Sequence, residues 1–206
     1  SEWRVEWDHI IERASSLVTF SENSASILRR VWPEQSDRLV VEPHALIGRT
    51  GNIRVDQSRP PVLGVLGSIG YNKGAGVLQK LADAAQGRFR IIVIGNLDPA
   101  FRHKGIDVHG AYDQSDIENL AELYGVSHWF VPSIWPETFC FAAHECLATG
   151  LPVLSFDIGA HGNAVGAHPR GTLVALDTPP HVLAEDVCDW LTSSALPSQK
   201  SGHQTR

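Results

Sequence analysis

The stretch Val131–Ala160, VPSIWPETFCFAAHECLATGLPVLSFDIGA, decides the fold. The apolar, strand-like run that leads into it is stopped at residues 132–136, because proline lacks an N–H and restricts the residue before it. Residues 139–149 suit a helix, and Gly150 stands where glycine commonly follows a helix end. Residues 152–156 form the next predicted strand. Strand, loop, helix and strand in this order are typical of a parallel sheet.

Two carboxylates flank the start of this helix. Glu137 lies in the loop before it, and Glu145 follows about two helical turns further on. The unpaired backbone N–H groups at the helix start would attract an anion, above all phosphate. A carboxylate further along suits hydroxyl groups better, because it accepts hydrogen bonds and repels negative charge. The arrangement predicts a nucleotide sugar as ligand; the alternative is that both glutamates are solvated charges beside a buried helix.

The residues around the two glutamates carry a family resemblance. Glu137-x7-Glu145, with Pro132-Ser133 before it and Gly150-x-Pro152-Val153 after it, resembles the signature of retaining glycosyltransferases of the GT-B fold, family 4 class. The resemblance implies that Glu137 contacts the donor sugar and acts in catalysis, and that Glu145 contacts the ribose hydroxyls. It also implies that backbone N–H groups between them hold the donor diphosphate; the residues concerned are Thr138, Phe139, Cys140 and Phe141.

A second anion-binding turn is predicted upstream. Residues 62–66 are predicted to form a buried strand and residues 75–85 a helix, and the loop GSIGYNKG joins them. Its glycines let the backbone approach a phosphate, and Lys73 adds a positive charge. The spacing is neither that of a Walker A loop nor that of a dinucleotide-binding loop. The loop resembles in part the family's G-R-x5-K-G loop, which implies that Lys73 stabilises the leaving diphosphate beside Gly67 and Ser68. A surface lysine in a turn is the alternative.

Two positions depart from the family pattern. Ser68 stands where the family usually has arginine, and serine cannot replace a planar, bidentate phosphate ligand. Cys140 stands where the family usually has glycine, so a side chain there would narrow the phosphate site. A backbone contact at residue 140 survives the substitution as long as φ stays negative.

Two further strands are predicted at residues 89–94 and 106–108, and the second ends at Gly110. In the family, the backbone after this glycine reads the edge of the nucleobase. The resemblance therefore assigns that role to Ala111 and Tyr112, with packing alone as the alternative for Tyr112.

The rest of the chain completes an alternating pattern. We predict a helix at residues 113–124, a loop at 159–171, a strand at 172–176 and a helix at 181–191. About six strands alternating with helices predict an α/β fold, namely a doubly wound, mostly parallel, Rossmann-like sheet. By resemblance this sheet is one half of a GT-B fold, with its ligand crevice at the carboxyl ends of the strands.

Composition changes along the chain predict its domain organisation. Residues 62–192 form the predicted nucleotide-sugar (donor) domain, preceded by a linker at 46–61 that is rich in Gly, Arg, Asn, Ser and Pro, and followed by a polar tail at 193–206. Residues 1–45 loosely resemble the last unit of the family's acceptor domain. They are interpreted as a remnant of that domain or as an N-terminal extension of the present one. The sequence has no methionine, so we expect a piece of a longer or processed protein.

The composition also limits the possible functions of the protein. An apolar fraction of 43% fits a folded protein, and a net charge of −6 argues against general nucleic-acid binding. The three cysteines show neither CxxC pairs nor the spacing of metal ligands, so we expect a cytoplasmic protein. No apolar run is long enough to span a membrane, and contact with the inner face of a membrane is compatible with this expectation. The ten histidines lack typical metal-ligand spacing, so we expect no metal, and no cofactor besides the donor substrate.

The predicted function is transfer of a sugar from a nucleoside diphosphate sugar with retention of anomeric configuration. Its partners are the nucleotide sugar and, through a missing domain, an acceptor glycan or lipid-linked glycan. The fragment alone is expected to bind donor but to turn over little. One alternative is a nucleotide-sugar epimerase on the same fold, for which His144 and His161 are the candidate acid/base groups. The other is a non-catalytic nucleotide-sugar-binding domain, which Ser68 and Cys140 would permit.

Overall fold

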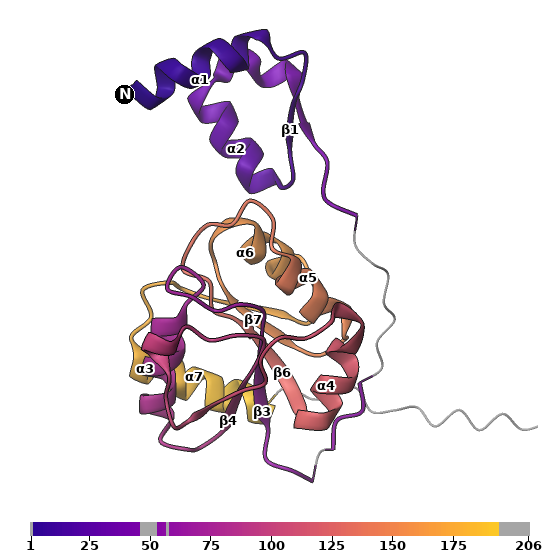
Figure 1. Ribbon diagram of the computed structural model, residues 1–206, viewed down its shortest axis with the longest axis vertical. Coiled ribbons are helices and arrows are strands. Elements are labelled where there is room, and N and C mark those ends of the chain that lie inside the picture. Colours follow the sequence, from indigo (N-terminus) through magenta and orange to yellow (C-terminus); the bar gives the residue numbers. More distant parts are fainter. Residues whose placement is uncertain (1, 46–52, 57, 194–206) are drawn as a thin grey trace, which may run out of the picture.

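The computed structural model describes residues 2–45, 53–56 and 58–193, which form a large α/β domain and a smaller N-terminal unit (Figure 1). The predicted linker at 46–61 lies partly, and the predicted tail at 193–206 almost wholly, outside these residues. Within the described part of the chain, no helix combines the length and apolar character that crossing a membrane requires.

The large domain is built on a six-stranded, all-parallel sheet of strand order β5-β4-β3-β6-β7-β8. This confirms the predicted fold class. The strands are β3 (Val62–Leu66), β4 (Arg90–Ile94), β5 (Ile106–Val108), β6 (Val126–Val131), β7 (Val153–Phe156) and β8 (Gly171–Val174). Every residue of β3, β6 and β7 is buried, as expected for strands covered on both faces.

Helices cover both faces of the sheet, because successive side chains of a strand point to opposite sides. On one face, Leu63 and Val65 pack with α3 (Ala75–Ala85) and α7 (Pro180–Ser193). On the other, Leu66 packs with α4 (Ile117–Tyr124) and α5 (Phe141–Ala148). Figure 1 shows α3 and α7 on one side of the strands and α4 on the other. Short 3-10 turns lie at η2 (Pro99–Phe101) and η3 (Gln114–Asp116).

The predicted loop at residues 159–171 is wrong in its first half. Residues Gly159–Gly166 form the helix α6. Its sequence, GAHGNAVG, lacks helical periodicity and contains three glycines, so local propensity favours a loop. Tertiary packing overrides that preference, because Val165 is completely buried and α6 packs against β7, β8 and α5.

The N-terminal unit is a strand–helix–strand motif preceded by a helix. It contains α1 (Glu2–Arg13), β1 (Leu17–Thr19), α2 (Glu22–Val31), η1 (Pro33–Arg38) and β2 (Leu39–Val41). The strands β1 and β2 pair in parallel, and Ser21 caps α2 by accepting a hydrogen bond from the Ser24 N–H. The core of this unit is small, with Ile11, Leu17 and Trp32 buried. Helix α2 contacts α6 of the large domain.

Candidate functional site

The candidate site lies where the strand order of the sheet reverses. Strands β3 and β6 are neighbours in the sheet but are separated in sequence by β4 and β5. In an open parallel sheet, ligands bind in the crevice outside the carboxyl ends of the strands at such a switch point. The loop after β3 carries Lys73, and the loop after β6 carries Glu137. The topology therefore brings the two predicted catalytic residues to one crevice.

Direct backbone contacts hold these two loops together. The Ile134 N–H donates to the Asn72 carbonyl at 3.0 Å, and the buried Ser133 hydroxyl lies 3.4 Å from the same oxygen. Gly74 adopts a left-handed backbone with φ of +84°, and a Cβ there would lie 2.0 Å from the Pro132 carbonyl oxygen. Only glycine permits this approach, so the loops form one rigid floor for the crevice.

Lys73 and Glu137 form an ion pair across the two loops. The Lys73 Nζ donates to Glu137 Oε2 at 3.2 Å. The Lys73 side chain is 49% exposed, whereas that of Glu137 is only 13% exposed. A half-exposed ammonium is screened by water, so this pair adds little to stability. The lysine is instead free to move toward another anion.

The start of α5 presents its backbone beside this pair. Cys140 is the N-cap residue, with φ of −124°, and it makes no capping hydrogen bond with its side chain. Its thiol is turned into the protein core, where burial first and Glu137 second raise the pKa of Cys140 to about 12. The negative φ meets the condition under which a backbone contact survives the substitution of glycine. The helix begins at Phe141, two residues later than predicted.

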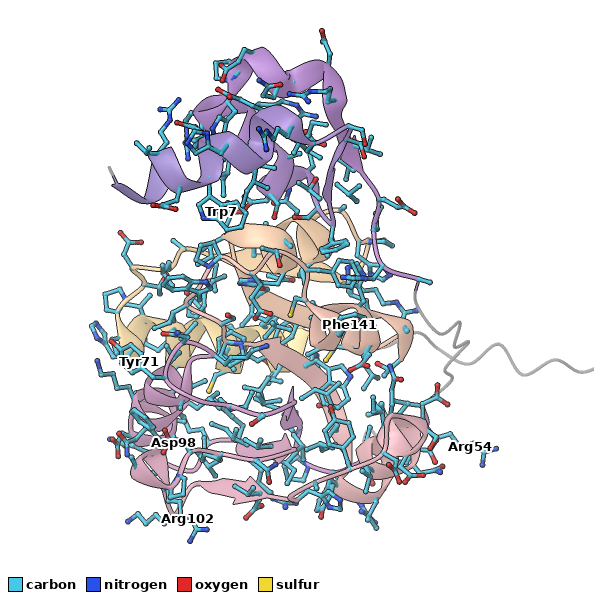
Figure 2. The ribbon with its side chains drawn as sticks, turned by 45° about the horizontal axis from the view of Figure 1, so that its top comes forward. Trp7, Arg54, Tyr71, Asp98, Arg102 and Phe141 are labelled. Atoms are coloured by element: carbon cyan, nitrogen blue, oxygen red, sulfur yellow. The ribbon has the colours of Figure 1, made fainter. Side chains whose placement is uncertain are left out.

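Aromatic rings cover this helix start from the N-terminal side. Phe139 stacks on His144 with ring centroids 4.6 Å apart, and Phe141 lies 5.0 Å from Phe139. His44 contacts both phenylalanines and stacks on Phe20 at 3.9 Å. Phe141, labelled in Figure 2, remains about half exposed. The rings of Phe139 and Phe141 thus join the N-terminal unit to the large domain through His44.

Glu145 lies further along α5 in a second group of polar side chains. Gln114 donates a hydrogen bond from its side-chain amide to Glu145 Oε1. Burial raises the pKa of Tyr112 to about 12, and the neighbouring Glu145 adds to this increase. Sequence reasoning missed Gln114, which lies six residues after the end of β5, at the start of η3. One oxygen of Glu145 is thereby held, which orients the carboxylate.

The remaining predicted site residues lie in the segments that follow β3 and β5. A Cβ added to Gly95 would lie only 2.0 Å from the carbonyl oxygen of Gly67, so the backbones at the ends of β3 and β4 are in close contact. Ser68 is exposed in the loop that follows. Ala111 and Tyr112 line a pocket of about 460 Å³ formed with η3 and α4, which includes neither Lys73 nor Glu137.

Of the two histidines considered as acid/base groups, His161 is enclosed and His144 is half-buried. The His161 side chain is fully buried, and neither ring nitrogen makes a hydrogen bond within the described residues. Burial lowers the pKa of His161 and also that of His144, which is stacked on Phe139. A ring without solvent access cannot exchange protons with a bound substrate, so the structure gives no support to His161 as the acid/base group of an epimerase.

Comparison with known proteins identifies the class to which this fold and crevice belong. Residues 60–193 match the profile of the family described as Glycosyl transferases group 1, and the chain therefore belongs to this family. It is 30% identical over 128 residues to a GDP-mannose-dependent alpha-mannosyltransferase of Mycobacterium tuberculosis (strain CDC 1551 / Oshkosh); the match covers 62% of this chain and 33% of that protein.

Solved structures share the fold at low sequence identity. A glycosyltransferase from Rickettsia africae ESF-5 superposes with a TM-score of 0.73 at 18% identity, covering 94% of this chain and 57% of the other. Sucrose-phosphate synthase from Thermosynechococcus elongatus gives 0.68 at 21% identity, with 92% and 52% covered. Anabaena HepE in complex with UDP and glucose gives 0.68 at 16% identity, with 92% and 57% covered. The domain thus has the Rossmann-like architecture of GT-B glycosyltransferases, and the chain spans one third to somewhat over half of these relatives.

Proposed function

We propose that this chain is the donor-binding half of a retaining glycosyltransferase that transfers a sugar from a nucleoside diphosphate sugar. The observation that carries the proposal is the Lys73–Glu137 ion pair at the switch point, shortly before the start of α5, with Glu145 about one turn into that helix. These groups match the three parts of such a donor. Lysine and helix-start amides suit a diphosphate, and carboxylates suit the hydroxyl groups of sugar and ribose.

Donor binding in this proposal is an exchange of partners. In the free protein the Lys73 ammonium neutralises the Glu137 carboxylate. An incoming diphosphate offers the ammonium more negative charge and draws it away from the glutamate. The freed carboxylate then accepts hydrogen bonds from the sugar. As the glycosidic bond to phosphate breaks, Lys73 and the backbone N–H groups of the α5 start stabilise the charge that develops on the diphosphate.

In this proposal, the acceptor is bound by a part of the enzyme that lies outside the present chain. A glycan or a lipid-linked glycan would be bound by a domain facing the crevice, and the chain by itself would bind donor but turn over little. The N-terminal unit packs against the α5 start through Phe20 and His44, as the end of such a domain would. Retention of configuration is part of the proposal on the strength of the family resemblance.

A thermal unfolding series tests donor binding. The chain is heated with UDP, GDP, ADP or inorganic phosphate, and GDP-mannose is added because the M. tuberculosis relative is named for it. A ligand at 100 times its Kd adds about 2.7 kcal/mol of stability, which raises Tm by several degrees. We expect one nucleoside diphosphate to give this shift, and Lys73→Ala and Glu145→Ala each to reduce it.

Matched surface variants make the test specific. Lys80→Ala and Glu185→Ala remove an exposed lysine and an exposed glutamate on α3 and α7, away from the crevice. Both should leave the ligand-induced shift unchanged. A shift that persists in Lys73→Ala and Glu145→Ala, or the lack of any shift with all five ligands, would contradict the proposed donor site.

A non-catalytic nucleotide-sugar-binding domain is the second candidate, and Ser68 is the observation that favours it. Ser68 is exposed at the position where the family usually has arginine, so the crevice lacks a bidentate phosphate ligand there. The two functions differ in one measurable respect. In the full-length protein, hydrolysis of the bound nucleotide sugar, or its transfer to an added glycan, supports the enzyme, whereas tight binding with a donor that stays intact supports the binding domain.

A further inference from the structure

The start of α6 is anchored to the loop that carries Glu137. The Ala160 N–H donates to the Glu137 carbonyl at 2.9 Å. Gly159 has φ of +59°, and a Cβ on it would lie 2.6 Å from Pro136 Cα. These contacts leave α6 little freedom to move relative to the loop. His161, two residues after Gly159, is therefore held at a fixed place beneath Glu137.

Two complementary polar groups lie at this place without a well-formed hydrogen bond. Among the described residues, neither ring nitrogen of His161 nor the buried Glu137 Oε1 has a partner at hydrogen-bond geometry, although the Ser133 backbone lies near the ring and the Cys140 thiol near the carboxylate. His161 is fully buried, and the Glu137 carboxylate lies close enough to favour its protonated form. An imidazole N–H is a donor and a carboxylate oxygen an acceptor, so the two groups can satisfy each other. Buried polar groups are rarely left unpaired without a reason.

We propose that His161 is a positioning residue for Glu137, holding Oε1 by a hydrogen bond from its imidazole N–H, directly or through one water molecule. The other carboxylate oxygen, Oε2, is bound by Lys73 in the free protein. When a diphosphate draws Lys73 away, Glu137 would lose that partner and rotate. A hydrogen bond from a ring fixed on α6 keeps the carboxylate directed at the sugar. The inference rests on the proposed function, because it assigns His161 a part in recognising the donor sugar.

The imidazole suits this role because it is neutral. Burial lowers the pKa of His161, and the positive charge of Lys73 acts in the same direction, whereas Glu137 and the Ser133 backbone oppose them. A neutral ring donates one N–H without adding a second positive charge beside the ammonium. The Glu137 carboxylate can then accept hydrogen bonds from sugar hydroxyls. His161 itself has no exposed surface through which it could contact the donor.

The contact is tested without any ligand by NMR of the chain labelled with ¹⁵N in its histidine rings. Glu137→Gln removes the charge but keeps the size of the side chain. We expect it to shift the His161 ring resonances, and we expect Glu145→Gln, on the same helix region but paired with Gln114, to leave them unchanged. His161 resonances that do not respond to Glu137→Gln would overturn the proposal.

The positioning role is tested by comparing a nucleoside diphosphate with the corresponding nucleotide sugar. GDP with GDP-mannose and UDP with UDP-glucose are used, and the ratio of the two Kd values measures recognition of the sugar. His161→Ala should reduce this ratio about tenfold, as expected for one hydrogen bond to a charged group. His161→Gln, which keeps an N–H donor, should restore most of it, and Kd for the diphosphate should stay within twofold.

The outcomes separate this inference from the proposed function. If the unaltered chain binds none of these nucleotides, the proposed function fails, while the NMR experiment still decides whether His161 holds Glu137. If His161→Ala and His161→Gln weaken diphosphate and nucleotide sugar equally, the histidine has only a structural role and the inference is wrong. An unchanged ratio in a folded His161→Ala protein would refute it as well.

Discussion

His128 lies in the middle of β6, and its side chain is 1% exposed. Nδ1 lies 2.9 Å from the Ser127 hydroxyl, Nε2 has no hydrogen bond within the described residues, and the ring packs against Trp190 at 4.6 Å. Burial lowers the pKa of His128 from 6.5 to about 4. The unfolded chain therefore binds a proton between these pH values and the folded chain does not. The stability from this group is full above pH 6.5 and is lost as pH falls toward 4.

This difference predicts an acid-sensitive free energy of unfolding. The shift corresponds to about 3 kcal/mol over the interval, since one pKa unit is about 1.4 kcal/mol. His128→Leu should reduce the slope of stability against pH by close to one proton between pH 6.5 and 4, as measured by urea unfolding. Some slope should remain, because burial also lowers the pKa of His144 and His161. Identical slopes for His128→Leu and the unaltered chain would contradict the prediction.

At the scale of single residues, the sequence indicated which side chains lie in the candidate site, but it did not indicate which residues those side chains contact. Lys73 and Glu137 were found from two separate loops, but their contact at 3.2 Å spans 64 residues and depends on the strand order. Gln114 escaped notice because its role exists only through Glu145, which lies on another element. The burial of His161 was not predicted either, because the surrounding residues were predicted to form a loop.

At the scale of elements, glycines in close contacts connect the loops of the crevice, and Gly74 offers a controlled test. Gly74→Ala would strain a residue with φ of +84° and place a methyl group 2.0 Å from the Pro132 carbonyl oxygen. Gly87→Ala is the matched control, because Gly87 has φ of +78° but no atom near its Cβ position. We expect Gly87→Ala to lower the free energy of unfolding, measured with urea, by about 1 kcal/mol. Gly74→Ala should lower it by at least ~2 kcal/mol more. Equal costs would show that the loops can separate freely.

The same kind of contact explains where element prediction succeeded and where it failed. The helix at residues 75–85 and the strand at 62–66 were predicted with their observed bounds, because local propensity and hydrophobic pattern agree there. The helix α6 was predicted as a loop because three of its residues are glycines. In the fold, a Cβ on Gly162 would lie 2.9 Å from the Phe156 carbonyl oxygen, and one on Gly166 would lie 2.8 Å from Leu173. Close packing against the backbone favours glycine at residue 162, whereas at residue 166 the end of the Leu173 side chain would have to shift. The sequence alone does not show such distances.

At the scale of the whole molecule, the two units differ greatly in how much core they contain. The large domain has a buried cluster on each face of its sheet, whereas the N-terminal unit has one small cluster around Trp32. A pair of three-residue strands with so little buried apolar area is marginal by itself. We therefore infer that the N-terminal unit draws stability from its contacts with the large domain, including the ring of His44, which stacks on Phe20 and contacts Phe139 and Phe141.

Hydrogen–deuterium exchange measured by mass spectrometry tests this dependence. Phe20→Ala removes the outermost ring, so residues 17–41 and 138–143 should both exchange faster, while β4 should not change. We expect roughly a tenfold effect, because a ring pair contributes about 0.5–1.5 kcal/mol and 1.4 kcal/mol is a factor of ten. Val18→Ala is the control, since Val18 lies on the same strand and is 48% exposed. Faster exchange confined to residues 17–41, or an equal effect of Val18→Ala, would mean that the rings do not couple the N-terminal unit to the start of α5.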